Sequence, residues 1–175
     1  IDDHADIGVE MLTDCIDKIN EGYSYPTFCT GIAGAGWVLD HLEQEEFMDA
    51  DNDDLLPELD QYIHTFMVTD MNNGNYDFLH GAIGYAFYFL NRYRNTKSDE
   101  LKQKYIGFIN EFLDLLEGLS EDAGDGKTRW ESELSIETKE RGYNLSLSHG
   151  MSSIVGILTK LHEQDDFKAK SEPML

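Results

Sequence analysis

The chain has little cysteine and little proline, and its histidines are scattered. Only two of its 175 residues are cysteine and three are proline. Two thiols cannot build the disulfide framework that small secreted domains use to compensate for a small core. We therefore expect Cys15 and Cys29 to be reduced and buried, as free cysteines usually are. The six histidines show no zinc-ligand spacing with either cysteine, so the sequence predicts no metal bound by this chain.

Positive charge and long apolar runs are also scarce. The net charge is −22, and residues 1–91 contain a single base, Lys18. Such an acidic surface repels the phosphates of nucleic acids and of anionic membranes, so we expect neither as a partner. The longest apolar run, residues 81–90, is too short to cross a bilayer. These absences favour a cytoplasmic protein.

One short phrase occurs three times, at residues 28–34, 78–84 and 147–153. In each copy an apolar residue stands three positions before a glycine, and a second glycine or a serine stands three positions after it. The copies are separated by about 50 and about 70 residues, which indicates one supersecondary unit used three times with loop insertions between. Packing alone is one interpretation of the second glycines, Gly34 and Gly84, and the serine at the equivalent Ser153 supports it.

Each phrase opens a helix that is apolar nearly all round, and an amphipathic helix precedes each of them. The sequence predicts inner helices near residues 31–42, 81–93 and 150–163, and outer helices near 3–20, 57–68 and 99–117. A helix without a polar face belongs inside a larger assembly, so Val38, Phe87 and Leu90 should be shielded from solvent. Amphipathic helices that alternate with apolar ones build two concentric layers, the arrangement of an all-α, α/α toroid.

The predicted domain organisation is simple. Residues 1–175 are expected to form a single partial α/α-toroid domain, interrupted by a long loop insertion at 118–146. The insertion contains Gly-Asp-Gly at 124–126, and it permits a short hairpin in which 127–131 pairs near 137–141. A loop this long in a compact domain is commonly functional or an edge decoration, and the sequence leaves both open.

Residues suited to chemistry gather in the loops that lead into the inner helices. Directly before the first glycine of the phrases stand Thr30, His80 and His149, and four positions before it stand Thr27, Asp77 and Ser146. In a toroid these positions face the central cavity. The positive end of a helix dipole favours a neutral imidazole, which can serve as a general base. Two histidines at equivalent positions are equally compatible with a remnant of repeat duplication.

At the repeats the chain resembles the lanthionine synthetase C-like family, the LanC-type cyclases. The best matches are residues 76–84, Tyr-Asp-Phe-Leu-His-Gly-Ala-Ile-Gly, and residues 144–151, Asn-Leu-Ser-Leu-Ser-His-Gly-Met. The resemblance spans essentially the whole chain and implies an α/α toroid whose inner helices begin with such glycine phrases. Three outer–inner helical hairpins with GxxG-type inner helix starts amount to half of an (α/α)6 toroid. The resemblance therefore implies the N-terminal half of a longer protein.

The activity that the resemblance implies is thioether formation. A cysteine thiol of a precursor peptide adds to a dehydroalanine or dehydrobutyrine and closes a lanthionine ring. By position, Asp77 looks like the family's active-site aspartate and His149 like its histidine, which handle the thiol proton and the enolate. His80 looks like a repeat-equivalent residue without an assigned role.

The resemblance is incomplete at the metal. The family's zinc is held by two cysteines and a histidine, in a Cys-Gly phrase and a Cys-His-Gly phrase, and this sequence contains neither phrase. We expect no cofactor in this chain and zinc in full-length family members. The chain alone is expected to be inactive, because the metal that would convert the thiol to a thiolate has no ligands here.

Two other interpretations stay open. One is an α/α-toroid carbohydrate-active enzyme, a glycosidase or lyase, which needs paired carboxylates, whereas only Asp77 stands out as a cavity carboxylate. The other is a non-catalytic helical scaffold that binds a partner in its cavity or at its open edge. Apolar surface at that edge predicts self-association, as a homodimer that completes a ring of six helical pairs.

Overall fold

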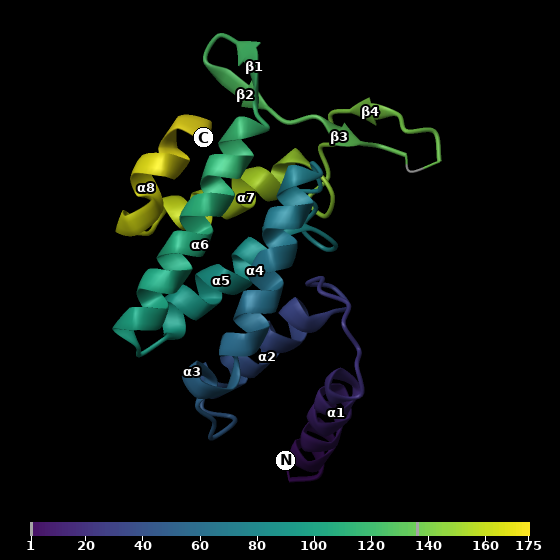
Figure 1. Cartoon of the computed structure of the whole chain (residues 1–175), viewed down its shortest axis with the longest axis vertical. Helices are drawn as coiled ribbons and strands as arrows, with labels where there is room; N and C mark the ends of the chain where they lie inside the picture. Colours follow the sequence, from purple (N-terminus) through teal and green to yellow (C-terminus); the bar gives the residue numbers. More distant parts are fainter. Residues whose placement is uncertain (1, 136) are drawn as a thin grey trace.

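The structure is a computed structural model that describes residues 2–135 and 137–175. Over these residues its regular secondary structure is helical apart from two short hairpins (Figure 1). The helices are α1 (Asp2–Asn20), α2 (Ile32–Gln44), α3 (Asn52–Leu55), α4 (Pro57–Asn72), α5 (Ala82–Asn95), α6 (Asp99–Gly118), α7 (Met151–His162) and α8 (Asp165–Ser171), followed by a 3-10 turn (Glu172–Met174). The all-α fold class is confirmed. The predicted inner helices correspond to α2, α5 and α7, and the predicted outer helices to α1, α4 and α6.

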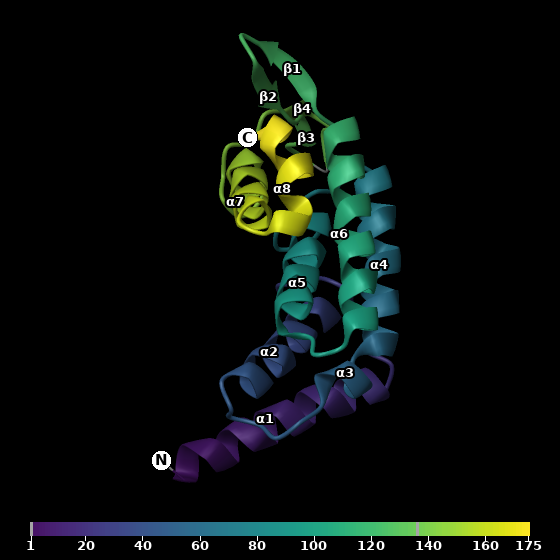
Figure 2. The same ribbon diagram turned by 90° about the vertical axis from the view of Figure 1, so that its left-hand side faces the viewer.

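The long helices lie in two layers. Figure 2 shows α2, α5 and α7 in one layer, with α4 and α6 beside them in the other. Local sequence explains where the outer helices begin. Pro57 occupies the first turn of α4, where its missing amide proton removes no helical hydrogen bond, and the Ser98 hydroxyl accepts a hydrogen bond from the Leu101 amide at the start of α6, at 3.3 Å. The short helices α3 and α8 were not predicted.

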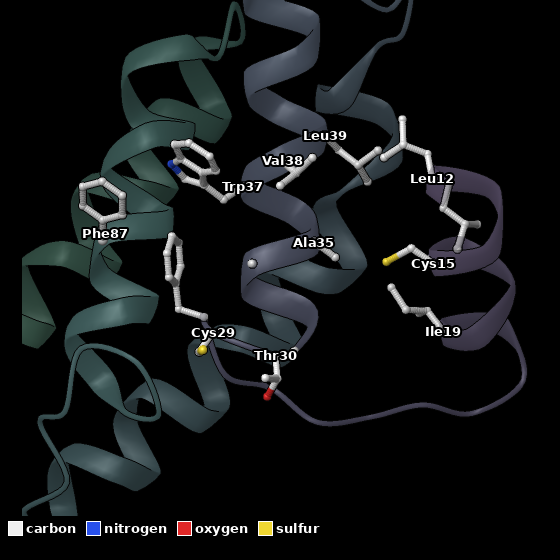
Figure 3. A pocket seen from close by; sticks show the side chains of 14 residues that line it. Leu12, Cys15, Ile19, Cys29, Thr30, Ala35, Trp37, Val38, Leu39 and Phe87 are labelled. Carbon is white, nitrogen blue, oxygen red and sulfur yellow. The ribbon is translucent and has the colours of Figure 1, made fainter. Parts of the chain in front are cut away.

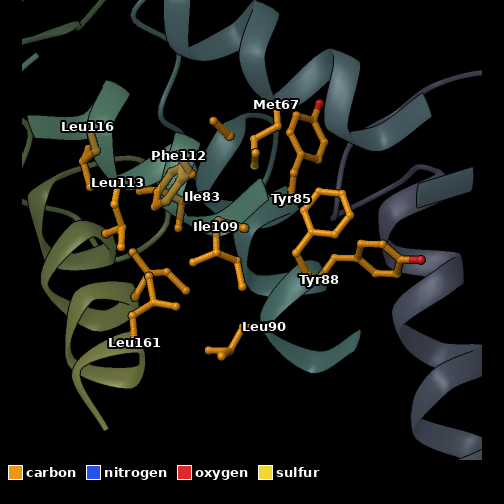
Figure 4. Packing of buried hydrophobic residues seen from close by; sticks show 14 of the residues in the cluster. Met67, Ile83, Tyr85, Tyr88, Leu90, Ile109, Phe112, Leu113, Leu116 and Leu161 are labelled. Carbon is orange, nitrogen blue, oxygen red and sulfur yellow. The ribbon is translucent and has the colours of Figure 1, made fainter. Parts of the chain in front are cut away.

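Helix α5 forms the centre of the hydrophobic core. It packs against α4 and α6 on its outer side and against α2 and α7 within its own layer. Figure 4 shows Ile83 and Tyr85 of α5 with Met67 of α4, Ile109 of α6 and Leu161 of α7, and all five side chains are buried. Because burying a large apolar side chain contributes about 1.5–3 kcal/mol, the position of α5 is firmly determined.

A charged cluster is buried beside the C-terminal part of α5. The Arg92 guanidinium is 1% exposed and donates to Asp40 Oδ1 of α2 at 2.7 Å. The hydroxyls of Tyr88 and Tyr105 each donate to the Asp60 carboxylate of α4, at 2.6 Å. Buried charges are tolerated only when they are paired and hydrogen-bonded, so this cluster joins α2, α4, α5 and α6 at one end of the molecule.

The first helical pair, α1 and α2, is less covered by other elements than predicted. Helix α1 stands beyond α2 at the end of the molecule (Figures 1 and 2), and its Ile7 and Met11 side chains are exposed. An apolar groove of about 670 Å³ separates α1 from α2 (Figure 3). Val38 of α2 is 38% exposed, so the prediction that it is shielded from solvent is wrong. Helical spacing identifies an apolar face, but no described element of the chain covers this one.

The two cysteines also differ from expectation. Cys15 lies on α1 at the apolar groove and Cys29 lies just before α2, and both are free and exposed. The prediction that they are buried is therefore wrong, for the same reason as for Val38. The predictions for α5 agree with the structure. Leu90 is buried, and Phe87 is partly buried against the core.

Residues 118–146 contain two small antiparallel hairpins. Strand β1 (Glu121–Gly124) pairs with β2 (Lys127–Arg129), and β3 (Ser132–Glu133) pairs with β4 (Arg141–Gly142). The predicted pairing of 127–131 with 137–141 is therefore wrong. The backbone φ angles of Gly124, Asp125 and Gly126 are all positive, at 81°, 54° and 71°. This tight turn pairs β2 with β1, the strand before it, and not with the segment that follows.

None of the described helices has the length and apolar character needed to cross a membrane.

Candidate active site

Three equivalent loops lead into α2, α5 and α7, and we call residues 25–31, 75–81 and 144–150 glycine loops 1, 2 and 3. In each, the amide after the closing glycine donates to the carbonyl oxygen six positions before that glycine, at 2.8, 3.1 and 2.7 Å. A Cβ atom on Gly31 or Gly150 would lie 2.2 Å from that oxygen. These glycines are therefore required because the loop backbone crosses the helix start at close range.

The second glycine of the phrase has a similar reason in the first two repeats. A Cβ atom on Gly34 would lie 2.1 Å from the Phe28 carbonyl oxygen, and one on Gly84 would lie 2.3 Å from the Phe78 oxygen. Close packing accounts for both glycines. The third repeat carries Ser153 instead, whose hydroxyl donates to the Gly150 carbonyl oxygen at 2.7 Å.

The glycine loops lie next to one another in the order of the chain. The Cys29 amide of loop 1 donates to the Leu79 carbonyl oxygen of loop 2 at 3.0 Å, and the Phe78 amide of loop 2 donates to the Ser148 oxygen of loop 3 at 3.3 Å. Side chains at equivalent positions of neighbouring loops are thereby brought together at the N-terminal ends of the inner helices.

Asp77 of loop 2 has two contacts, one for each carboxylate oxygen. Its Oδ1 atom accepts a hydrogen bond from the His80 amide at 2.8 Å, which closes the turn before α5. The Ser146 hydroxyl accepts from the His149 amide in the same way in loop 3, at 3.0 Å. The remaining oxygen of Asp77, Oδ2, lies 2.5 Å from His149 Nδ1. The two side chains that sequence reasoning singled out are therefore in direct contact.

The contact between Asp77 and His149 is accessible from solvent. The Asp77 side chain is 19% exposed and the His149 side chain is 48% exposed. The ring of His80 lies nearly parallel to that of His149, with 6.2 Å between centroids and 13° between planes. Loop 1 has a threonine, Thr30, in place of these histidines, so it supplies no titratable group at this position.

The insertion at 118–146 holds the start of loop 2 in place, which sequence reasoning missed. The buried Tyr76 hydroxyl donates to the Trp130 carbonyl oxygen at 3.2 Å, and the indole of Trp130 donates to the Leu116 oxygen of α6 at 2.9 Å. Burial raises the pKa of the Tyr76 hydroxyl, which keeps it a neutral donor. A tryptophan in a polar loop was the available signal, because such a residue is rarely left in solvent.

The geometry gives the imidazole a defined chemistry. A carboxylate accepts hydrogen bonds, so the neutral His149 ring carries its proton on Nδ1, where it faces Asp77. The other ring nitrogen, Nε2, then holds a lone pair that can accept a proton. If it does, the adjacent carboxylate stabilises the imidazolium that forms. The result is a solvent-accessible imidazole that is oriented by a carboxylate and that has the geometry a general base requires.

The described residues do not fit a zinc ion. Within residues 4–135 and 137–175, no three histidine, cysteine, aspartate or glutamate side chains converge on a point where they could hold a metal. The Nδ1 atom of His149 is already occupied by Asp77. The expectation that this chain binds no zinc stays a prediction.

Comparison with known proteins gives one result at the level of the family. The model of a family described as "Lanthionine synthetase C-like protein" matches residues 2–172. No curated protein and no solved structure matches the chain.

Proposed function

The chain belongs to the lanthionine synthetase C-like protein family, and on that premise we propose that it is part of a peptide cyclase. The reaction is the addition of peptide cysteine thiols to dehydroamino acids, which forms thioether rings. The single observation that carries this proposal is the contact between His149 Nδ1 and Asp77 Oδ2 at the N-terminal ends of two inner helices.

The contact supports a specific division of labour in the reaction. His149 accepts the thiol proton at Nε2 as the sulfur attacks the β-carbon of the dehydroamino acid and forms the new carbon–sulfur bond. The electron pair of the carbon–carbon double bond moves into an enolate. The imidazolium then returns the proton to the α-carbon, so that every atom is accounted for. Asp77 keeps the ring oriented and stabilises its charged form.

Zinc supplies thiolate formation in family members that bind it. Because the described residues offer no set of three ligands, the proposal assigns only the proton transfers to this chain.

The partner in this proposal is a precursor peptide, and the compartment is the cytoplasm. The net charge of −22 disfavours nucleic acid and anionic membranes as partners. The exposed side chains of Val38 on α2 and Val155 on α7 support the proposed homodimer, because both belong to inner helices at the two ends of the row.

Thioether formation by the natural full-length protein tests the proposal. The substrate is a peptide that contains one cysteine and one dehydroalanine, and the readout is the loss of thiol that can be alkylated, followed by mass spectrometry. Asp77→Asn and His149→Ala should each lower the rate by about a hundredfold, the usual contribution of general acid–base catalysis.

The matched control is Thr30→Val, which changes the residue of loop 1 equivalent to His149 and should leave the rate unchanged. Full activity in Asp77→Asn or His149→Ala would mean that these positions are structural. The absence of any ring closure by the unaltered protein would refute the proposed function itself.

A further inference from the structure

The three repeats differ at one position in the middle of their inner helices. Six residues after the first glycine, the first two repeats carry an aromatic residue and the third carries a glycine: Trp37, Phe87 and Gly156. A second difference lies three residues before the first glycine of the phrase. There the first two repeats carry phenylalanine and the third carries leucine: Phe28, Phe78 and Leu147.

The aromatic residues of each of the first two repeats fill the space between loop and helix. The rings of Phe28 and Trp37 lie 6.1 Å apart, and those of Phe78 and Phe87 lie 5.7 Å apart, both edge to face. Figure 3 shows Trp37 and Phe87 near each other on neighbouring inner helices. The third repeat has neither ring, and a cavity of about 220 Å³ lies there, between α5 and α7.

The lining of this cavity is almost entirely apolar. Its walls include Phe78, Ile83 and Phe87 from the second repeat, and Leu147, Gly156 and Ile157 from the third. A cavity of this size is smaller than the sites that hold drug-sized ligands, and its volume suits a single side chain. Ser153 and Lys160 also line the cavity, but its lining surface is mostly apolar, which favours an apolar occupant.

No packing constraint requires the glycine at position 156. It lies inside α7, its φ angle is not positive, and a Cβ atom there would meet no neighbouring atom within 4 Å. Glycine destabilises a helix interior relative to alanine. Gly31 and Gly150, by contrast, are required by a backbone oxygen 2.2 Å from the position of the missing Cβ. The effect of Gly156 is to keep the cavity open.

The cavity adjoins the candidate active site. Phe78 directly follows Asp77, and Leu147 stands two positions before His149, so glycine loops 2 and 3 supply both the wall and the acid–base pair. Leu147 is 69% exposed, which places the mouth of the cavity at the surface. A peptide held at the pair would therefore have the cavity within reach of a neighbouring residue.

We propose that this cavity binds one apolar side chain of the peptide substrate, on a residue next to the one that reacts. The inference rests on the proposed function and names the specificity of the same site: peptides with an aromatic or large aliphatic residue beside the cysteine bind best. The open position at Gly156 in the third repeat is the determinant.

Peptide binding tests the proposal independently of catalysis. The probes are two fluorescent peptides in which phenylalanine or glycine precedes a cysteine, without a dehydroamino acid, so that no reaction follows. Fluorescence anisotropy should show that the unaltered chain binds the phenylalanine peptide about tenfold more tightly. Gly156→Phe, which restores the aromatic residue of the other repeats, should abolish the preference. Gly156→Ala is the matched control and should keep most of it.

The possible outcomes distinguish a peptide side chain from a second copy of the chain as the occupant of the cavity. They also distinguish this inference from the proposed function. Equal binding of both peptides by the unaltered chain, or an undiminished preference in Gly156→Phe, overturns the inference. So does a dimer that Gly156→Phe converts to a monomer in sedimentation, because a second copy would then fill the cavity. A preference for the phenylalanine peptide in an unaltered protein that forms no thioether supports the cavity and refutes only the reaction.

The test does not depend on the folding of Gly156→Phe. Methyl resonances of Ile83 and Ile157, which line the cavity, should shift when the phenylalanine peptide is added to the unaltered chain. The glycine peptide should leave them in place, and identical shifts with both peptides would overturn the inference.

Discussion

Two clusters of acidic and basic side chains lie at opposite ends of the inner helices, and they differ in what surrounds them. At the N-terminal ends, Asp77 contacts His149 where both side chains are accessible. At the C-terminal ends, Arg92 contacts Asp40, and both side chains are 1% exposed. The first pair can reach a bound molecule, whereas the second cannot.

The difference in hydrogen bonding follows from this difference in burial. Arg92 uses its donors within the protein, on Asp40, on the Asn52 carbonyl oxygen and on the Tyr105 hydroxyl. Its role is to join helices. His149 uses one ring nitrogen on Asp77, which leaves the other for chemistry. Under the proposed function, similar charged groups on one fold therefore serve stability at one end and reactivity at the other, as their environment dictates.

The largest expected effect is a loss of stability, and it comes from the buried cluster. Arg92→Met should lower the free energy of unfolding by about 3–5 kcal/mol, because it leaves Asp40 and Asp60 buried without their cation. Urea unfolding measures this. The matched control is Arg94→Met, two residues on, whose side chain is 36% exposed and lies 3.7 Å from Glu163; it should cost less than about 1 kcal/mol. Equal losses in the two variants would contradict the distinction.

The second effect is a loss of stability at alkaline pH that comes from the buried cluster. Burial and the nearby Asp60 charge raise the pKa of Tyr88 and of Tyr105 well above 10.0. Above pH 10 the unfolded chain therefore releases tyrosine protons that the folded chain retains, and stability falls as the pH rises. Each tyrosine should contribute a slope of about 1.4 kcal/mol per pH unit.

Urea unfolding between pH 9 and pH 11 measures this slope. Tyr105→Phe should remove one contribution, so its curve should be less steep than that of the unaltered protein. A stability that stays level across this range would show that the cluster does not bind its protons as its burial requires.

Local and repeated features could be predicted from the sequence, and non-local ones could not. Helical spacing placed α2, α5 and α7 to within about two residues, the usual uncertainty of helix ends. The family resemblance singled out Asp77 and His149, and the order of the repeats placed their two loops side by side. Both results depend on short segments and on their repetition.

The wrong predictions for Val38 and Cys15, and the burial of Arg92, which was not predicted, have one physical cause. Spacing shows which face of a helix is apolar, but whether another element covers that face depends on residues far away in the chain. Arg92 follows an apolar run and resembles an ordinary charged helix end. Its burial depends on Asp40, a residue 52 positions away. Gly156 was within reach of sequence reasoning, because aligning the repeats sets it against two aromatic residues.

The smallest expected effect on stability is also the sharpest test of the exposed pair. Asp77→Ser should change the free energy of unfolding by less than about 1 kcal/mol. A serine oxygen can still accept the His80 amide proton, as the Ser146 hydroxyl accepts that of His149 in the third loop. The same substitution removes the oxygen that contacts His149 Nδ1, so thioether formation should fall about a hundredfold. Asp77→Ala is the control: it removes both contacts and should cost about 1 kcal/mol more in urea unfolding, as the loss of a capping side chain does. If Asp77→Ser instead lost stability as Arg92→Met does and kept its rate, the exposed end would be as structural as the buried one.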